Sequence, residues 1–133
     1  MNEGYNKDIP KGAEEVRVIS FSAPSALNTD VVGTDSQTGE SFFNLATINS
    51  IIRVIEDQTQ TATPKYTYRI ERDGYLIRSL YSDLAKAESP GPVYPGFPLN
   101  LSPGQYQIRM QQTVTGTGLA ARNLSLVFQK SLV

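Results

Sequence analysis

The sequence predicts an all-β domain, an antiparallel β-sandwich or jelly roll of about eight strands. Three observations indicate this fold class. Apolar and polar residues alternate with a period of two in several segments. The pair Asp73-Gly74 separates two of these segments, and the other connections are rich in Gly, Pro, Ser and Thr. Short strands between such turns favour two sheets closed on one core.

Composition limits the chemistry that the chain can perform. It has 133 residues, 39% of them hydrophobic, and contains no His, Cys or Trp. A chain of this length buries about two-thirds of its extended surface, which is enough for a single core without metals or disulfides. Because imidazole and thiol groups supply the commonest bases, nucleophiles and metal ligands, we expect no enzymatic activity, no cofactor and no metal site.

The charge and the apolar runs restrict the partners. A net charge of -1 gives no long-range field that would attract a polyanion or an acidic membrane, so nucleic acid is disfavoured. No apolar run approaches the roughly 20 residues needed to cross a bilayer, and no signal peptide is visible. We therefore expect a complete protein made in the cytoplasm, without a membrane partner.

The chain begins with a polar segment. Residues 1–14 show no periodicity, and we expect a flexible N-terminal arm that, in the functional alternative, orders against a neighbouring subunit. A single β-sandwich domain then spans residues 15–133. Its first strand begins at Glu15, alternates through Phe21 and is ended by Pro24.

Residues 42–55 are harder to assign. A helix from Leu45 to Ile52 is conceivable, but the density of β-branched residues favours strand. We expect one long or bent strand, or two strands with a break near Asn49 and Ser50.

The clearest local signal spans residues 66–81, where Asp73-Gly74 has the chemistry of a two-residue type I′ hairpin. This turn places Arg72 opposite Tyr75, and the register continues with Ile70 opposite Ile77, Tyr68 opposite Ser79 and Tyr66 opposite Tyr81. One face of the hairpin then collects Tyr66, Tyr68, Ile70, Ile77 and Tyr81.

The other face of this hairpin contains a conflict. It places Arg69 across from Arg78, and a like-charge pair in that position costs stability. Either a carboxylate from another strand lies between the two guanidinium groups, or a longer loop shifts the register.

Residues 84–98 form a long predicted loop. Proline recurs at every third position, at Pro92, Pro95 and Pro98. This spacing matches polyproline II and can mark a ligand for an aromatic groove. We favour a stiff crossover between the two sheets, in which Tyr94 and Phe97 pack as a lid or a contact patch.

The C-terminal third is predicted to be a second β unit. Alternation through Leu99 and Leu101 precedes a turn at Ser102-Pro103-Gly104. The strand that follows has an apolar face comprising Tyr106, Ile108, Met110 and Val114. A turn at residues 116–118 leads to a partner face of Leu124, Leu126 and Phe128, and we expect a long hairpin with one solvated side.

Carboxylates are the remaining conventional catalytic groups. Asp30 and Asp35 flank a turn at Gly33, and Glu56 and Asp57 end an apolar strand. Such pairs can hydrolyse glycosides or bind calcium, but neither pair has the spacing of a known ligand loop. We interpret them as turn-forming residues at strand ends.

Arginine and tyrosine point to a different chemistry. All seven arginines lie in predicted strands: Arg17, Arg53, Arg69, Arg72, Arg78, Arg109 and Arg122. With the interleaved tyrosines, these arginines could bind single-stranded nucleic acid. A simpler interpretation is that the arginines occupy outward positions of the strands and form ion pairs with the thirteen acidic residues. Both residue types are also enriched at protein interfaces. Carbohydrate binding is disfavoured because Trp, its usual aromatic, is missing.

The stretch Leu101–Met110, Leu-Ser-Pro-Gly-Gln-Tyr-Gln-Ile-Arg-Met, resembles a turn-plus-strand motif found late in fibronectin-like, immunoglobulin-like and jelly-roll domains. The wider layout resembles small viral or bacteriophage capsid components of jelly-roll type, such as penton, decoration and cement proteins. The shared features are a polar arm, long Pro/Gly/Thr loops, the lack of Cys and His, and a Thr/Gln-rich face.

The resemblance implies a non-enzymatic structural protein that self-associates and serves as a capsid accessory, vertex or decoration protein in the virion, with itself and other capsid proteins as partners. A non-viral chain would be cytoplasmic. We expect the interface to include Tyr94, Phe97, Pro92, Pro95, Arg69 and Arg78. The alternatives are a glycan- or host-protein-binding module and a single-stranded nucleic-acid-binding domain.

Overall fold

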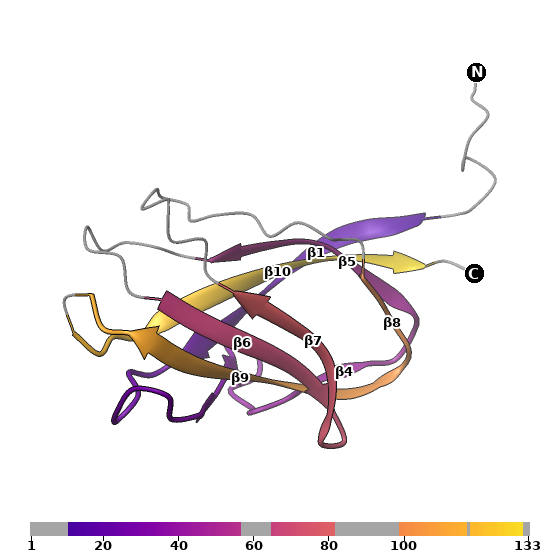
Figure 1. Cartoon of the computed structure of the whole chain (residues 1–133). Helices are drawn as coiled ribbons and strands as arrows, with labels where there is room; N and C mark the ends of the chain where they lie inside the picture. The colour runs from indigo at the N-terminus through magenta and orange to yellow at the C-terminus, as the bar shows by residue number, and fades with distance from the viewer. Residues whose placement is uncertain (1–10, 57–64, 82–98, 117, 132–133) are drawn as a thin grey trace.

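The computed structural model describes residues 11–56, 65–81, 99–116 and 118–131. In these residues ten strands form two antiparallel sheets of five strands each, packed face to face, and no helix occurs among them (Figure 1). The predicted all-β class and the β-sandwich are confirmed. The jelly-roll connectivity stays a prediction.

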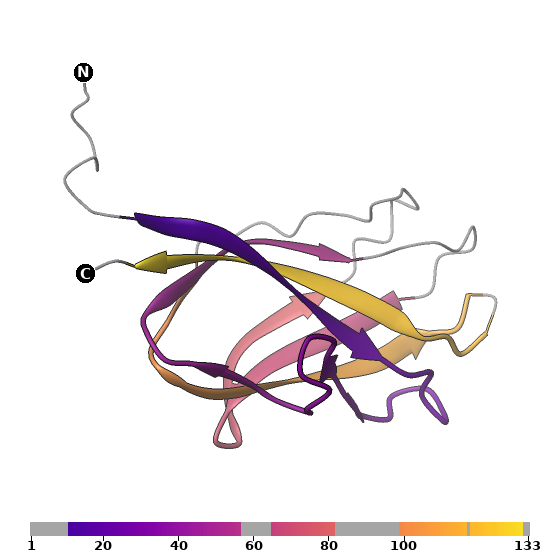
Figure 2. The same ribbon diagram turned by 180° about the vertical axis from the view of Figure 1, so that it is seen from behind.

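The first sheet has the strand order β3-β1-β10-β5-β8. Its strands are β1 (Lys11–Phe21), β3 (Thr34–Asp35), β5 (Asn49–Glu56), β8 (Leu99–Leu101) and β10 (Arg122–Ser131). β1 therefore includes residues 11–14, which the sequence assigns to the arm. β1 and β10 pair along their length, and Figures 1 and 2 show the start of β1 beside the end of β10.

The second sheet has the order β2-β9-β6-β7, and β4 also pairs with β9. Its strands are β2 (Val31–Val32), β4 (Phe43–Leu45), β6 (Lys65–Arg72), β7 (Tyr75–Tyr81) and β9 (Gly104–Val114). β9 and β6 are the long central strands, and their solvated faces carry most of the charged residues of this sheet.

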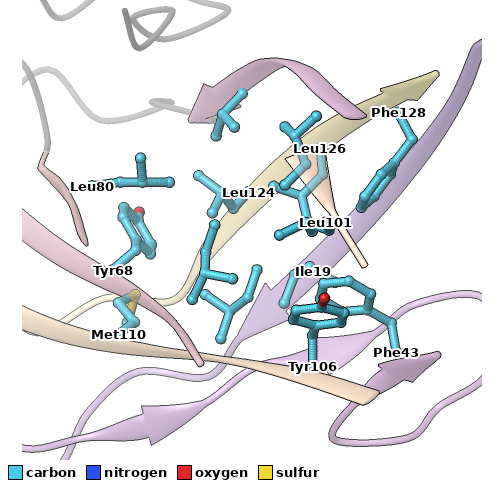
Figure 3. Packing of buried hydrophobic residues seen from close by; sticks show 14 of the residues in the cluster. Ile19, Phe43, Tyr68, Leu80, Leu101, Tyr106, Met110, Leu124, Leu126 and Phe128 are labelled. Carbon is cyan, nitrogen blue, oxygen red and sulfur yellow. The ribbon is translucent and has the colours of Figure 1, made fainter. Parts of the chain in front are cut away.

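Alternating side chains from both sheets meet in one core, part of which Figure 3 shows. Aromatic rings join the two layers. The rings of Phe43 and Tyr106 stack within the second sheet at 5.6 Å between centroids, and Phe128 of the first sheet meets Phe43 edge-on at 5.9 Å. Phe21 of β1 likewise contacts Tyr68 of β6 at 5.5 Å. Edge-to-face and offset pairs of this kind add to the stabilisation from apolar burial.

The C-terminal third differs from the predicted hairpin. β9 and β10 do not pair, because β9 belongs to the second sheet and β10 to the first. The turn near Gly116 thus crosses between the layers. The two apolar faces do meet, but across the core, where Ile108 and Met110 lie on the opposite sheet from Leu124 and Leu126.

Residues 42–55 form two strands, β4 and β5, and the helix considered for this segment is wrong. The strands belong to different sheets, so the chain must leave one layer and enter the other between them. The break falls at residues 46–48, just before the predicted position, and Asn49 already begins β5. The amide of Asn49 donates to the backbone oxygen of Thr47 at 2.9 Å and fixes this connection.

The β6–β7 turn is confirmed, but the register of the hairpin beyond it is wrong. Arg72 pairs with Tyr75 as predicted, and a β-bulge then places Ile70 opposite Arg78, Arg69 opposite Ser79, Tyr68 opposite Leu80 and Thr67 opposite Tyr81. The additional residue is Ile77. The bulge brings Leu80 into the core in place of Ile77 and Tyr81, and it removes the like-charge pair between Arg69 and Arg78.

Among the described residues, no helix has the length and apolar character that crossing a membrane requires.

Candidate interaction surface

The solvated face of the second sheet carries a charged ladder. Arg69 on β6 lies directly opposite Arg109 on β9. Two carboxylates neutralise this pair: Asp30 accepts a hydrogen bond from Arg69 at 2.5 Å, and Glu71 accepts one from Arg109 at 2.9 Å. Gln111 also donates to Asp30, at 2.6 Å. A carboxylate therefore does compensate Arg69, although the opposing arginine is Arg109 and not Arg78.

This ladder holds Asp30 in its charged form. The hydrogen bond from Gln111 and then the hydrogen bond and charge of Arg69 lower the pKa of Asp30 below its ordinary value of 3.8, while desolvation opposes the shift. Arg109 adds a further favourable charge. The network attaches the segment before β2 to the sheet, and its charges balance within the network. This arrangement explains Arg69 without any partner molecule.

The structure places the two predicted arginines at neighbouring positions of the β6–β7 hairpin but on opposite faces of the sheet. Arg69 belongs to the ladder, and Arg78 is half-buried on β7, opposite the fully buried Ile70. The other four predicted interface residues, Pro92, Tyr94, Pro95 and Phe97, lie outside the described residues. A role for any of these residues at an interface stays a prediction.

A set of exposed apolar side chains lies on β7, at the edge of the second sheet. We call it the β7 patch; its members are Tyr75 (76% exposed), Leu76 (57%), Ile77 (39%) and Tyr81 (63%). The β6–β7 turn beside it projects from the body of the molecule in both views (Figures 1 and 2). Single exposed apolar residues are common, but several on one short strand indicate a contact surface.

The sequence reasoning missed this patch, because it placed Ile77 and Tyr81 on the core face. A signal was present. Tyr75, Leu76 and Ile77 are consecutive, and a strand with a period of two cannot direct three consecutive side chains into one core. Such a run predicts either a bulge or exposed apolar residues, and the structure contains both.

The position of β7 strengthens this interpretation. Proteins commonly protect sheet edges by making the edge strands very short. In the described part of the chain, β2 and β3 have two residues each and β8 has three, whereas β7 has seven. No strand pairs with the outer side of β7 among these residues. The patch and a long sheet edge therefore coincide.

Two of the carboxylates considered as catalytic residues, Asp35 and Glu56, are buried and form hydrogen bonds within the fold. Asp35 is buried and accepts hydrogen bonds from Arg17 at 3.0 Å and from the backbone N–H of Gln37 at 2.9 Å. Glu56 is fully buried and accepts a hydrogen bond of 2.5 Å from Tyr68. Asp57 lies outside the described residues. Within those residues, no group of three or more acidic side chains is placed to bind a metal ion.

Two hollows in the described surface are small. One, of about 160 Å³, lies beside the β6–β7 turn and is lined by Glu71, Asp73 and Gln107, among others. The other, of about 200 Å³, lies between β1 and the β4–β5 connection and includes Glu15 and Asn44 in its lining. Ligand pockets typically enclose about 300–1,000 Å³, so neither hollow has the size expected for a small-molecule site.

No protein-family profile, curated protein sequence or solved structure matches this chain. The functional interpretation therefore depends on the sequence and the geometry.

Proposed function

We propose that this protein is a non-enzymatic structural component that self-associates, and that it serves as an accessory, vertex or decoration protein of a viral capsid. In this role its partners are further copies of the chain and other capsid proteins, and its location is the virion. The exposed apolar β7 patch carries the proposal.

Two features of the patch support association with another protein. Tyr75 and Tyr81 provide large, rigid side chains that combine an apolar ring with a hydroxyl group, and tyrosine is enriched at the energetic centres of interfaces. Leu76 and Ile77 add exposed aliphatic surface on the same strand. Burial of such side chains yields roughly 25 cal/mol per Å² of apolar area, before the cost of ordering is subtracted.

The interior supports a structural role over a catalytic one. The buried polar groups of the described residues fix loops and sheets: Asp35 holds the turn after β3, and Gln112 holds the connection between β9 and β10. The capsid assignment rests on a different argument, the resemblance of the sequence layout to small capsid components. Fold alone does not define function, so this part needs its own test.

Light scattering on the purified protein tests self-association. We expect the wild type to exceed the monomer mass, and the double substitution Leu76→Ser with Ile77→Ser to reduce assembly. Leu27→Ser is the matched control, because Leu27 is 38% exposed, like Ile77 at 39%, but lies outside β7. Tyr94→Ala and Phe97→Ala test the predicted loop anchors in the same assay.

Each alternative has a distinct outcome. A strictly monomeric wild type at high concentration contradicts the proposal. Glycan binding by that monomer, lost when an exposed tyrosine is replaced, would instead support a ligand-binding module. Oligonucleotide binding with a steep salt dependence would support a nucleic-acid-binding domain. Copurification with assembled particles from an infected host would support the capsid role.

A further inference from the structure

We propose that two copies of this chain pair antiparallel through their β7 strands, about a two-fold axis that passes beside Ser79, so that their second sheets form one continuous sheet. This inference rests on the proposed self-association, and it names the surface, the symmetry and the register of the contact. The occupant of the β7 edge is thus the β7 strand of a second copy.

The length of β7 selects this occupant. In the described residues, the strands at the ends of the two sheets are β2, β3, β7 and β8. β2 and β3 have two residues each and β8 has three, whereas β7 has seven. The backbone groups on the outer side of an edge strand form a template for another strand, and a strand of similar length satisfies most of them. Among these four strands, only another β7 has that length.

β1 is a less suitable partner, because its outer side is already protected. On the side away from β10, β3 pairs with the end of β1, and the N–H of Ser36 donates to the backbone oxygen of Val18 at 3.0 Å. The stretch before Val18 carries Glu15 and Arg17, which form an ion pair with each other. Charged side chains at an edge oppose pairing with another chain. β7 carries a single charged residue, Arg78, and lacks this protection along most of its length.

The two faces of β7 restrict the register. Ser79 lies opposite Arg69, on the solvated face of the second sheet, whereas Leu80 lies opposite the buried Tyr68. Residues that pair directly across antiparallel strands lie on the same face. When a strand pairs with its own copy about a two-fold axis, this rule requires that one residue face its own counterpart on the axis.

Ser79 is the residue that suits the axis. The bulge at Ile77 leaves residues 78–81 as the regular part of β7 that follows it. With Ser79 on the axis, Arg78 lies opposite Leu80 of the second copy, and Ile77 lies beside Tyr81. Ile77 is 39% exposed and Tyr81 63%, so this register brings two exposed apolar side chains together on each side of the axis. With Leu80 on the axis, Tyr81 would meet Ser79 and Ile77 would stay exposed.

The size of the contact predicts a weak, reversible dimer. An aromatic side chain such as that of Tyr81 buries about 150–250 Å². Contacts that bury less than about 1,200 Å² in total are typical of transient complexes. A contact limited to one edge strand of each copy falls in this range, so we expect dimers to accumulate as the concentration rises.

The contact is isologous, because both copies use the same surface. It closes at two subunits, and no β7 edge remains open to add a third copy in the same way. The bulge at Ile77 also limits the regular ladder at one end. Pairing through β7 therefore gives a dimer and not a filament.

Disulfide trapping tests the position of the axis. The chain contains no cysteine, so each introduced thiol is unique. Residues that face each other across antiparallel strands have Cα atoms about 4.5–5.5 Å apart, within the range that a disulfide spans. Under mild oxidation, we therefore expect Ser79→Cys to form a covalent dimer.

Leu76→Cys is the matched control on the same strand. Leu76 is 57% exposed and Ser79 is half-buried, so random collisions would favour cross-linking at position 76. In the proposed register the two copies of Leu76 lie roughly 20 Å apart along the strands, too far for a disulfide. Cross-linking of Leu76→Cys that equals or exceeds that of Ser79→Cys would overturn the register.

A charge on the axis provides an independent readout. Ser79→Glu brings two carboxylates together in the dimer, and we expect it to weaken association by about five-fold. Within its own chain the new carboxylate lies opposite Arg69, so the monomer keeps its stability, which circular dichroism checks. Ser79→Gln is the neutral control of similar size. Equal association of these two variants would contradict the contact.

Sedimentation velocity on the same samples separates the two proposals. An oligomer that neither cross-links through Ser79→Cys nor weakens with Ser79→Glu overturns the β7–β7 contact and leaves self-association intact. A monomer in every sample overturns both.

Discussion

Tyr68 on β6 donates a hydrogen bond of 2.5 Å to Glu56 on β5, and this bond joins the two sheets inside the core. Both residues are fully buried. A carboxylate at this depth is costly to desolvate unless hydrogen bonds compensate it. The pair therefore fixes how β5 and β6 lie relative to each other, which apolar contacts alone specify less strictly.

Tyr68→Phe tests this connection. Removing the hydroxyl leaves the buried carboxylate with one donor fewer, and we expect the free energy of unfolding to fall by about 2 kcal/mol. The measurement is the urea midpoint at unchanged slope. Tyr75→Phe removes the same hydroxyl from an exposed ring and should leave the midpoint close to wild type. Equal midpoints for the two variants would show that the hydrogen bond contributes little.

The ladder around Asp30 predicts a dependence of stability on pH. Its pKa is lower in the folded state than the ordinary value of 3.8, so the carboxylate contributes stability above that pH and loses it as the pH falls through the folded value. We expect Asp30→Asn to be less stable than wild type near neutral pH, and the difference to shrink below about pH 4.

Urea unfolding at several pH values measures this difference. Asp73→Asn is the control, because Asp73 is exposed at the turn and its backbone φ of 52° suits asparagine equally well. A constant difference between wild type and Asp30→Asn from pH 7 to the acid range would contradict the role of the ladder.

Gln112 holds the crossing from β9 to β10. Its amide donates to the backbone oxygen of Gly118 at 2.8 Å, and its oxygen accepts from the N–H of Ala120 at 3.1 Å. Gln112→Leu should destabilise the protein by about 2–3 kcal/mol, since buried backbone groups lose their partner. Hydrogen exchange at Ala120 should accelerate more than exchange in β9. Gln105→Leu, on the exposed face of β9, should change neither.

Gly33 allows the chain to pass from β2 in one sheet to β3 in the other. A Cβ at this position would overlap the side chain of Ile19 and approach the ring of Phe21 to 2.7 Å. We expect Gly33→Ala to lower stability by about 1–3 kcal/mol through overpacking, with Ser41→Ala as an exposed control. Thermal unfolding compares the two, and a Gly33→Ala midpoint within a degree of wild type would contradict the close approach.

Much of the fold follows from alternation, because burial on one face imposes a period of two. Ile19 and Phe21 in β1, and Ile108 and Met110 in β9, are buried as this period predicts. Sheet membership was harder to predict. Local pattern does not distinguish a hairpin from a crossing between layers, and the turn near Gly116 is a crossing.

The strand pattern also failed where polar groups enter the interior. Gln112 is fully buried although Val114, two residues later, is 41% exposed. This burial depends on tertiary structure. The side-chain amide of Gln112 forms hydrogen bonds with backbone groups of Gly118 and Ala120, and the sequence does not identify the loop that contains them as its partner. The conflict between Arg69 and Arg78 is visible in the sequence, but its resolution is not. The bulge at Ile77 depends on which residue of β7 fills the core, and in the structure Leu80 does so.

The claim that this sandwich acts by self-association is tested most directly by sedimentation equilibrium of the wild-type protein over a wide concentration range. The account predicts a weight-average mass that rises with concentration well above the chain mass of 14.6 kDa. It also predicts that Leu76→Ser with Ile77→Ser shifts this rise to higher concentrations. A mass that stays at the monomer value throughout would contradict the claim.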